Sequence, residues 1–168
     1  GRVLISGQST LSSTSLTHRL QVKSQNDANA IAIFGRDGDD IGELSFYEAD
    51  KTTKLGELQL RTDQLNLRAR TAGADINFAT VPSGGSLGDR MTIKAAGQVL
   101  IGTTTEGHTS ADDLTIATSG ATGITIRSGT SNAGNIYFSD ATSGTAEYAG
   151  YVSYSHSTNS LSFGTNDG

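Results

Sequence analysis

Gly97-Gln-Val-Leu-Ile-Gly102 repeats the pattern that opens the chain, Gly1-Arg-Val-Leu-Ile-Ser6, at an offset of 96 residues (97 − 1). Two further stretches recur in the same order, at offsets of 92 (134 − 42) and 94 (150 − 56): Gly42-Glu-Leu-Ser-Phe46 as Gly134-Asn-Ile-Tyr-Phe138, and Gly56-Glu-Leu-Gln-Leu60 as Gly150-Tyr-Val-Ser-Tyr154. A drifting offset is typical of a repeat that keeps its strands while its loops vary. We therefore predict a tandem repeat, with a first copy at 1–96 and a second, truncated copy at 97–168.

Short apolar–x–apolar triplets recur along the whole chain, and alternation with period two is the pattern of a strand with one apolar face. The triplets are Val3/Ile5, Leu20/Val22, Ile31/Ile33, Leu44/Phe46, Leu58/Leu60, Leu65/Leu67, Ile76/Phe78, Met91/Ile93, Val99/Ile101, Leu114/Ile116, Ile124/Ile126, Ile136/Phe138, Val152/Tyr154 and Leu161/Phe163. Gly, Asn, Asp, Ser and Thr separate them, as turn residues do. The pattern predicts an all-β chain. A helix over 59–72 is the alternative there, and the alternation of its leucines favours strands.

The composition narrows the classes of protein that the chain can represent. Only 35% of the 168 residues are hydrophobic and 17% are charged, and there are 21 glycines and no cysteine. Disulfides are therefore excluded as a source of stability. The net charge of −5 and the dispersed basic residues disfavour nucleic acid as a partner. No apolar run approaches the ~20 residues that span a bilayer, so we expect no membrane insertion.

Each predicted strand carries few large apolar side chains, which limits the core that one copy of the chain can build. At about 25 cal/mol per Å2, two half-buried aliphatic side chains per strand contribute little against the entropy of ordering the glycine-rich turns. Unpaired strand edges would also need cover. A core shared between identical chains relieves both problems, so we expect an intertwined homotrimer with threefold cyclic symmetry.

The segment Arg90-Met-Thr-Ile-Lys-Ala-Ala-Gly-Gln-Val-Leu-Ile-Gly-Thr-Thr-Thr105 resembles a repeat of tailed-bacteriophage tail fibres and tailspikes, of the type R-M-x-I-x-x-x-G-x-V-x-I-G-T-T. The matching residues are Arg90, Met91, Ile93, Gly97, Val99, Ile101, Gly102, Thr103 and Thr104. Glu106 departs from the pattern, since proline is common near that position. The rest of the chain resembles such fibre shafts more loosely.

The resemblance implies a trimeric, β-rich segment of a virion appendage, located outside the cell, whose partners are other copies of the chain and other tail proteins. Such repeats often precede a self-cleaving chaperone domain that uses a Ser/Lys pair. Asp89-Arg90 lacks both the preceding serine and the spaced lysine of that motif, so we expect any such domain to lie beyond Gly168.

Carboxylates and histidines are the first candidates for catalysis or metal binding. Asp37, Asp39 and Asp40 cluster, but they lack the spacing and terminal glutamate of a calcium loop. Asp112 and Asp113 form a second cluster, and both clusters fall between triplets, where aspartate is an ordinary turn residue. His18, His108 and His156 form no metal-binding spacing, although one histidine per chain could meet its symmetry mates on a threefold axis. No nucleophile elbow or phosphate loop occurs.

We therefore expect no catalytic residue, no metal site and no cofactor. Tyr47, Tyr137 and Tyr151 are candidates for contact with a host glycan, because aromatic rings on an outer sheet face can stack on sugars. Cross-strand packing is the competing interpretation for all three.

The leading hypothesis is a non-enzymatic structural segment of a phage tail fibre. A bacterial surface adhesin or extracellular filament subunit with a similar repeat is the first alternative. A fragment of a polysaccharide-degrading tailspike is the second, because such enzymes use paired carboxylates.

Overall fold

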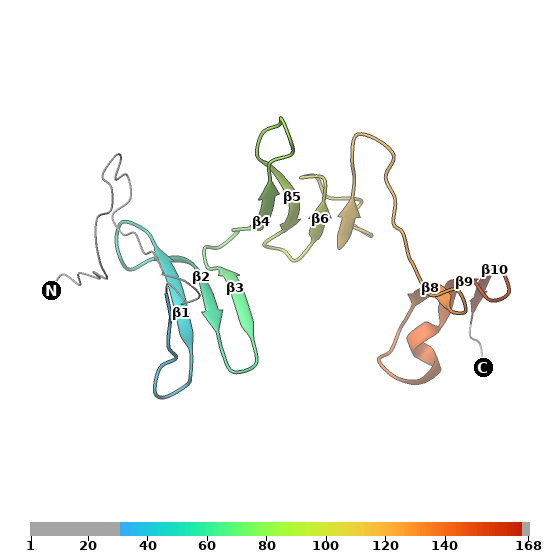
Figure 1. The fold of residues 1–168 in the computed structure, drawn as a ribbon, viewed down its shortest axis with the longest axis horizontal. Helices are drawn as coiled ribbons and strands as arrows, with labels where there is room; N and C mark the ends of the chain where they lie inside the picture. Colours follow the sequence, from blue (N-terminus) through green and yellow to red (C-terminus); the bar gives the residue numbers. More distant parts are fainter. Residues whose placement is uncertain (1–30, 166–168) are drawn as a thin grey trace, which may run out of the picture. The chain divides into compact units, whose positions relative to one another are not determined.

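The computed structural model describes residues 31–165. In this part of the chain, strands form three sheets, and the remaining regular element is a short 3₁₀ helix, η1 (Gly144–Tyr148) (Figure 1). The predicted all-β class is thus confirmed. The chain divides into two compact units between Thr115 and Ile116.

The first sheet contains β1 (Gly42–Tyr47), β2 (Lys54–Leu60) and β3 (Leu65–Ala69), in that order and all antiparallel. Two cross-strand rows put leucines on one face: Leu44–Leu58–Leu67 and the pair Leu60–Leu65. The rows between them carry polar side chains on the other face, since successive residues of a strand point to opposite sides.

The second sheet has the order β4 (Ile76–Thr80), β5 (Gly88–Ile93), β6 (Val99–Ile101) and β7 (Leu114–Ile116). The predicted repeat boundary at 96/97 falls in the turn between β5 and β6. Gly97 lies in that turn with a φ of +107°, which glycine tolerates and other residues rarely adopt. Its amide donates to the Lys94 carbonyl, and the Lys94 amide donates to the Gln98 carbonyl.

The third sheet contains β8 (Ala133–Phe138), β9 (Gly150–Ser155) and β10 (Ser160–Thr165), with β9 in the centre. Its register matches that of the first sheet row by row. Phe46 pairs with Gly56 in the first sheet, as Phe138 pairs with Gly150 in the third. The Leu44–Leu58–Leu67 row of the first sheet corresponds to Ile136–Val152–Phe163 in the third.

The structure places ten of the predicted triplets on β1 to β10 and corrects two. Ile31/Ile33 and Ile124/Ile126 are not on strands. Each of these segments approaches the next strand at its first glycine: the Cβ position of Gly42 lies 3.4 Å from the Ile33 carbonyl oxygen, and that of Gly134 lies 3.2 Å from Ile126 Cγ2. A turn follows each segment before a ladder of hydrogen bonds can extend, and alternation without a paired neighbour does not make a strand. Val3/Ile5 and Leu20/Val22 lie outside the described residues.

Few apolar side chains of the described residues are buried. Ile41 and Leu100 are the buried hydrophobic residues of this part of the chain, whereas 25 large hydrophobic residues are exposed. A soluble monomer rarely exposes large contiguous apolar patches.

Candidate functional site

The exposed apolar side chains of the first sheet lie together on one face, which we call the first apolar face. The pairing register aligns them in adjacent rows, and their exposed fractions range from 36% to 68%. The first apolar face consists of Leu44, Phe46, Leu58, Leu60, Leu65 and Leu67. This face carries no charged residue, so its burial in an interface would remove no ion from water.

The opposite face of the first sheet is closed by an ion-pair cluster around Glu57. The Glu57 residue is only 1% exposed. Its carboxylate accepts hydrogen bonds from Lys54 Nζ at 2.8 Å, Arg68 Nη1 at 3.0 Å and Arg70 Nη2 at 2.6 Å. The hydrogen bond from Lys54, followed by that from Arg70, lowers the pKa of Glu57 to about 2. The charges of the polar face are therefore paired within the chain, although Gln59 Oε1 and Asn66 Nδ2 on the same face are buried without a hydrogen-bond partner among the described residues. The apolar face is the one that stays exposed.

Glu43 extends the same cluster from β1. It accepts a hydrogen bond from Lys54 Nζ and another, at 3.2 Å, from Gln59 Nε2. The lysine hydrogen bond is the main cause of the lowered pKa of Glu43. The same interaction is the main cause of the raised pKa of Lys54. Sequence reasoning missed this cluster, because its members stand in the positions between the apolar triplets and only the cross-strand register brings them together.

The third sheet has an equivalent exposed surface, the second apolar face. Phe163 is its most exposed member at 74%. The face consists of Ile136, Phe138, Val152, Tyr154, Leu161 and Phe163. The other side of this sheet carries the Asn135–Ser153–Ser162 row and Tyr137 beside Tyr151.

The structure brings together two of the three tyrosines predicted to contact glycans. Tyr137 and Tyr151 are register partners on β8 and β9. Tyr148 of η1 joins them, with its ring centroid 5.8 Å from that of Tyr137; alternation does not single out this residue. Tyr47 belongs to the other compact unit, where Lys54 Nζ lies 5.7 Å from its ring centroid. Glycan contact at these tyrosines stays a prediction.

The predicted carboxylate clusters lie in turns and loops. Asp39 binds the Arg36 guanidinium and accepts a hydrogen bond from the Ile41 amide, which closes the turn before β1. Asp40 follows in that turn with a φ of +53°. The Asp113 carbonyl accepts a hydrogen bond from the Val99 amide, whereas Asp112 lies in the loop before β7.

The histidines are dispersed in the described structure. His108 Nδ1 accepts a hydrogen bond from the Ser110 amide, and the His156 ring packs edge-on against Tyr154. His18 lies outside the described residues. Within residues 31–165, no three metal-ligating side chains come together.

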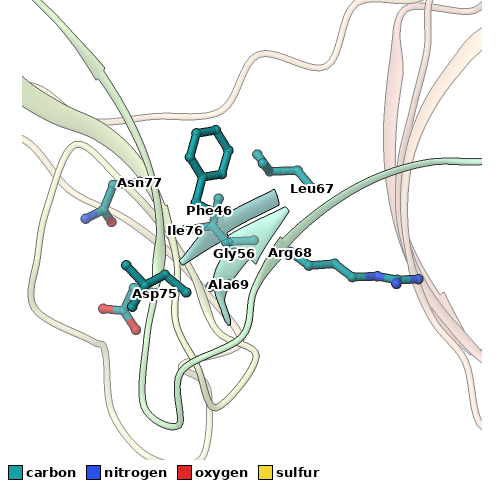
Figure 2. Close-up of a pocket in the computed structure, with 9 residues that line it drawn as sticks. Phe46, Gly56, Leu67, Arg68, Ala69, Asp75, Ile76 and Asn77 are labelled. Carbon is teal, nitrogen blue, oxygen red and sulfur yellow. The ribbon is translucent and has the colours of Figure 1, made fainter. Parts of the chain in front are cut away.

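A hollow of about 330 Å3 opens on the first apolar face above Gly56 (Figure 2). Phe46, Leu67 and Ala69 line it from the first sheet, and Ile76 lines it from the start of β4. The Arg68 side chain extends away from the Phe46 ring and Leu67, toward the ion-pair cluster. The hollow is thus bounded mostly by apolar atoms.

Comparisons with known proteins add no relative to this picture. No family model matches the chain, and no curated protein or solved structure matches it either. Among the described residues, no helix has the length and apolar character needed to cross a bilayer. The two apolar faces are the features of the described residues that bear most directly on function.

Proposed function

We propose that the chain is a non-enzymatic structural segment of a bacteriophage tail fibre, which forms a homotrimeric shaft from tandem β-repeats in the virion, outside the cell. The observation that carries the proposal is the pair of three-stranded sheets with one register and one exposed apolar face each. The Arg90–Thr105 segment adds its resemblance to tail-fibre repeats. A scaffold that repeats one association surface along its length builds an elongated assembly. A mechanical role is therefore the first interpretation.

The exposed area is large enough to hold copies of the chain together. At about 200 Å2 for a fully exposed large side chain, the exposed fractions on each apolar face correspond to roughly 600 Å2. The two faces together exceed the ~800 Å2 per partner that a standard interface buries. Because the faces are uncharged, their burial carries no desolvation penalty for ions.

Identical copies are the simplest partners for such faces, because the same surface is always present at the same concentration. Around a threefold axis, three sheets can turn their apolar faces inward and leave their polar faces in water. The ion-pair cluster of the first sheet and the Asn135–Ser153–Ser162 row of the third then form the outer surface. The preference for three copies over two comes from the resemblance to tail fibres.

The mass of the 168-residue chain in solution tests the proposal. Light scattering should give about three times 17.4 kDa. Phe163→Asp should shift this mass toward the monomer, because a carboxylate would then enter the shared core without a partner. This change should cost the isolated chain little stability, since Phe163 is already exposed in it.

Ser162→Asp is the matched control. Ser162 neighbours Phe163 on β10 but points to the opposite face, and it is also exposed. The same added charge should leave the mass unchanged there. A wild-type chain that stays monomeric at all accessible concentrations would contradict the proposal.

A further inference from the structure

The two sheets differ at one equivalent position, the central-strand glycine beside a phenylalanine. In the third sheet, the Phe138 side chain lies over Gly150: the Phe138 Cβ and ring Cδ2 atoms are 3.4 and 3.5 Å from the place where a Cβ of Gly150 would stand. In the first sheet, the corresponding place at Gly56 has the Arg68 backbone as its only described neighbour within 4 Å. The Phe46 ring stands off Gly56 and leaves the hollow open.

The walls of the hollow continue the first apolar face. Phe46 and Leu67 belong to both, and Ala69 extends the Phe46–Gly56 row onto the edge strand β3. Asp75 stands at the rim, where Lys94 Nζ and the Ala95 amide both donate to its carboxylate at 2.9 Å. The charge at the rim is thus paired within the chain, and the apolar floor remains without cover.

The turn after β3 fixes the shape of the hollow. The Arg70 amide donates to the Leu55 carbonyl at 2.8 Å, which continues the β2–β3 pairing by one residue. The Ala74 amide donates to the Thr71 carbonyl at 3.0 Å, and Gly73 takes a φ of +78°. After this turn the chain enters β4, whose first residue, Ile76, lines the hollow.

We propose that this hollow is a socket for an apolar side chain from the first apolar face of a second copy of the chain. The inference rests on the proposed self-association and identifies one place where two copies of the chain interlock. The occupant follows from continuity, because any partner that covers the first apolar face must also cover the hollow within it. It also follows from chemistry, since an apolar floor with a paired rim offers no charge to a polar ligand. An empty hollow of this size at an interface would forfeit packing contacts.

Cysteine accessibility at Ala69 tests the socket directly. The chain has no native cysteine, so Ala69→Cys introduces one thiol at the wall of the hollow on an exposed edge position. Ala72→Cys is the matched control, because Ala72 is exposed in the turn after β3 and outside the hollow. In the assembled protein, a bulky maleimide should label the cysteine of Ala69→Cys at least ten-fold more slowly than that of Ala72→Cys. Dilution to the monomer should bring the two rates together.

A second pair of variants fills the hollow from within. Ala69→Phe should raise the dissociation constant of the oligomer at least ten-fold, whereas Ala72→Phe should leave it unchanged. Far-UV circular dichroism of the diluted monomers should agree with the wild type for both. Equal labelling rates and equal dissociation constants in a trimeric protein would overturn the socket and leave the proposed function standing. A wild-type monomer would overturn both.

Discussion

At the scale of single residues, Glu57 determines on which face of the first sheet the charges are paired within the chain. A carboxylate that is 1% exposed is tolerated only where cations and hydrogen bonds replace water. Lys54, Arg68 and Arg70 supply them from β2, β3 and the residue after β3. Their long side chains fold over the sheet and cover the carboxylate. The polar face therefore becomes less exposed than the apolar one.

Replacing this carboxylate with an isosteric amide should reveal its contribution through pH. The pKa of Glu57 is lowered from 4.5 to about 2 in the folded chain. Its stabilising contribution is therefore full above pH 4.5 and is lost as the pH falls toward 2. Glu57→Gln should lower the Tm at neutral pH, and the gap to the wild type should narrow between pH 4.5 and 2. Thermal unfolding followed by circular dichroism measures this gap.

Glu147→Gln provides the control, because Glu147 is an exposed carboxylate on η1. Its Tm should follow that of the wild type across the same range of pH. A constant gap between Glu57→Gln and the wild type from pH 7 to 2 would argue against the ion-pair cluster.

At the scale of elements, the sheets depend on how closely their strands approach. The Cβ of an alanine at position 56 would lie 2.8 Å from the Arg68 carbonyl oxygen, so β2 and β3 would have to separate. At position 150 the nearest atoms belong to the Phe138 side chain, at 3.4 Å or more, which is an ordinary contact. Replacing glycine with alanine should therefore cost more stability at position 56 than at the equivalent position 150.

We expect Gly56→Ala to destabilise the protein by about 1–3 kcal/mol, the usual range for overpacking. Gly150→Ala should change the free energy of unfolding by less than about 1 kcal/mol. Urea unfolding of both variants at one protein concentration compares them. Equal losses would mean that the close approach of β2 and β3 at Gly56 is not a constraint.

The alternation of apolar residues was enough to predict the strands, and it could not predict their pairing. Ile124/Ile126 has the same pattern as Ile136/Phe138, yet only the second triplet lies on a strand. Pairing depends on the turns and neighbours of a segment, which alternation does not encode. The same limit hid the Glu57 cluster: opposite charges on β2 and β3 indicate an ion pair only once the register is known. The tyrosine contact with η1 depends on the path of the loop from Ser139 to Ala149, for which the sequence has no periodic signal.

At the scale of the whole molecule, most of the large apolar side chains of the described residues are exposed to solvent in the single chain. Stability should therefore depend on association, and association on concentration. For a homotrimer of the wild type, a hundred-fold rise in protein concentration should add about 1.8 kcal/mol per chain, two thirds of RT ln 100. That corresponds to a rise in Tm of roughly 4–7 °C. Differential scanning calorimetry at several concentrations measures this shift.

Phe163→Asp should have a lower Tm that depends less on concentration than that of the wild type, because the added carboxylate weakens association through the second apolar face. A wild-type Tm independent of concentration would mean that the apolar faces do not associate in solution.

The first and third sheets share their rows but differ in one connection. Residues 48–53 join β1 to β2, whereas residues 139–149 join β8 to β9 and include η1. The longer connection leaves the pairing of β8 with β9 in the same register as that of β1 with β2. Selection can therefore act on the length and sequence of this connection without disturbing the rows. The sheets are the constrained part of the molecule, and the connection is where one copy of the unit can acquire a surface of its own.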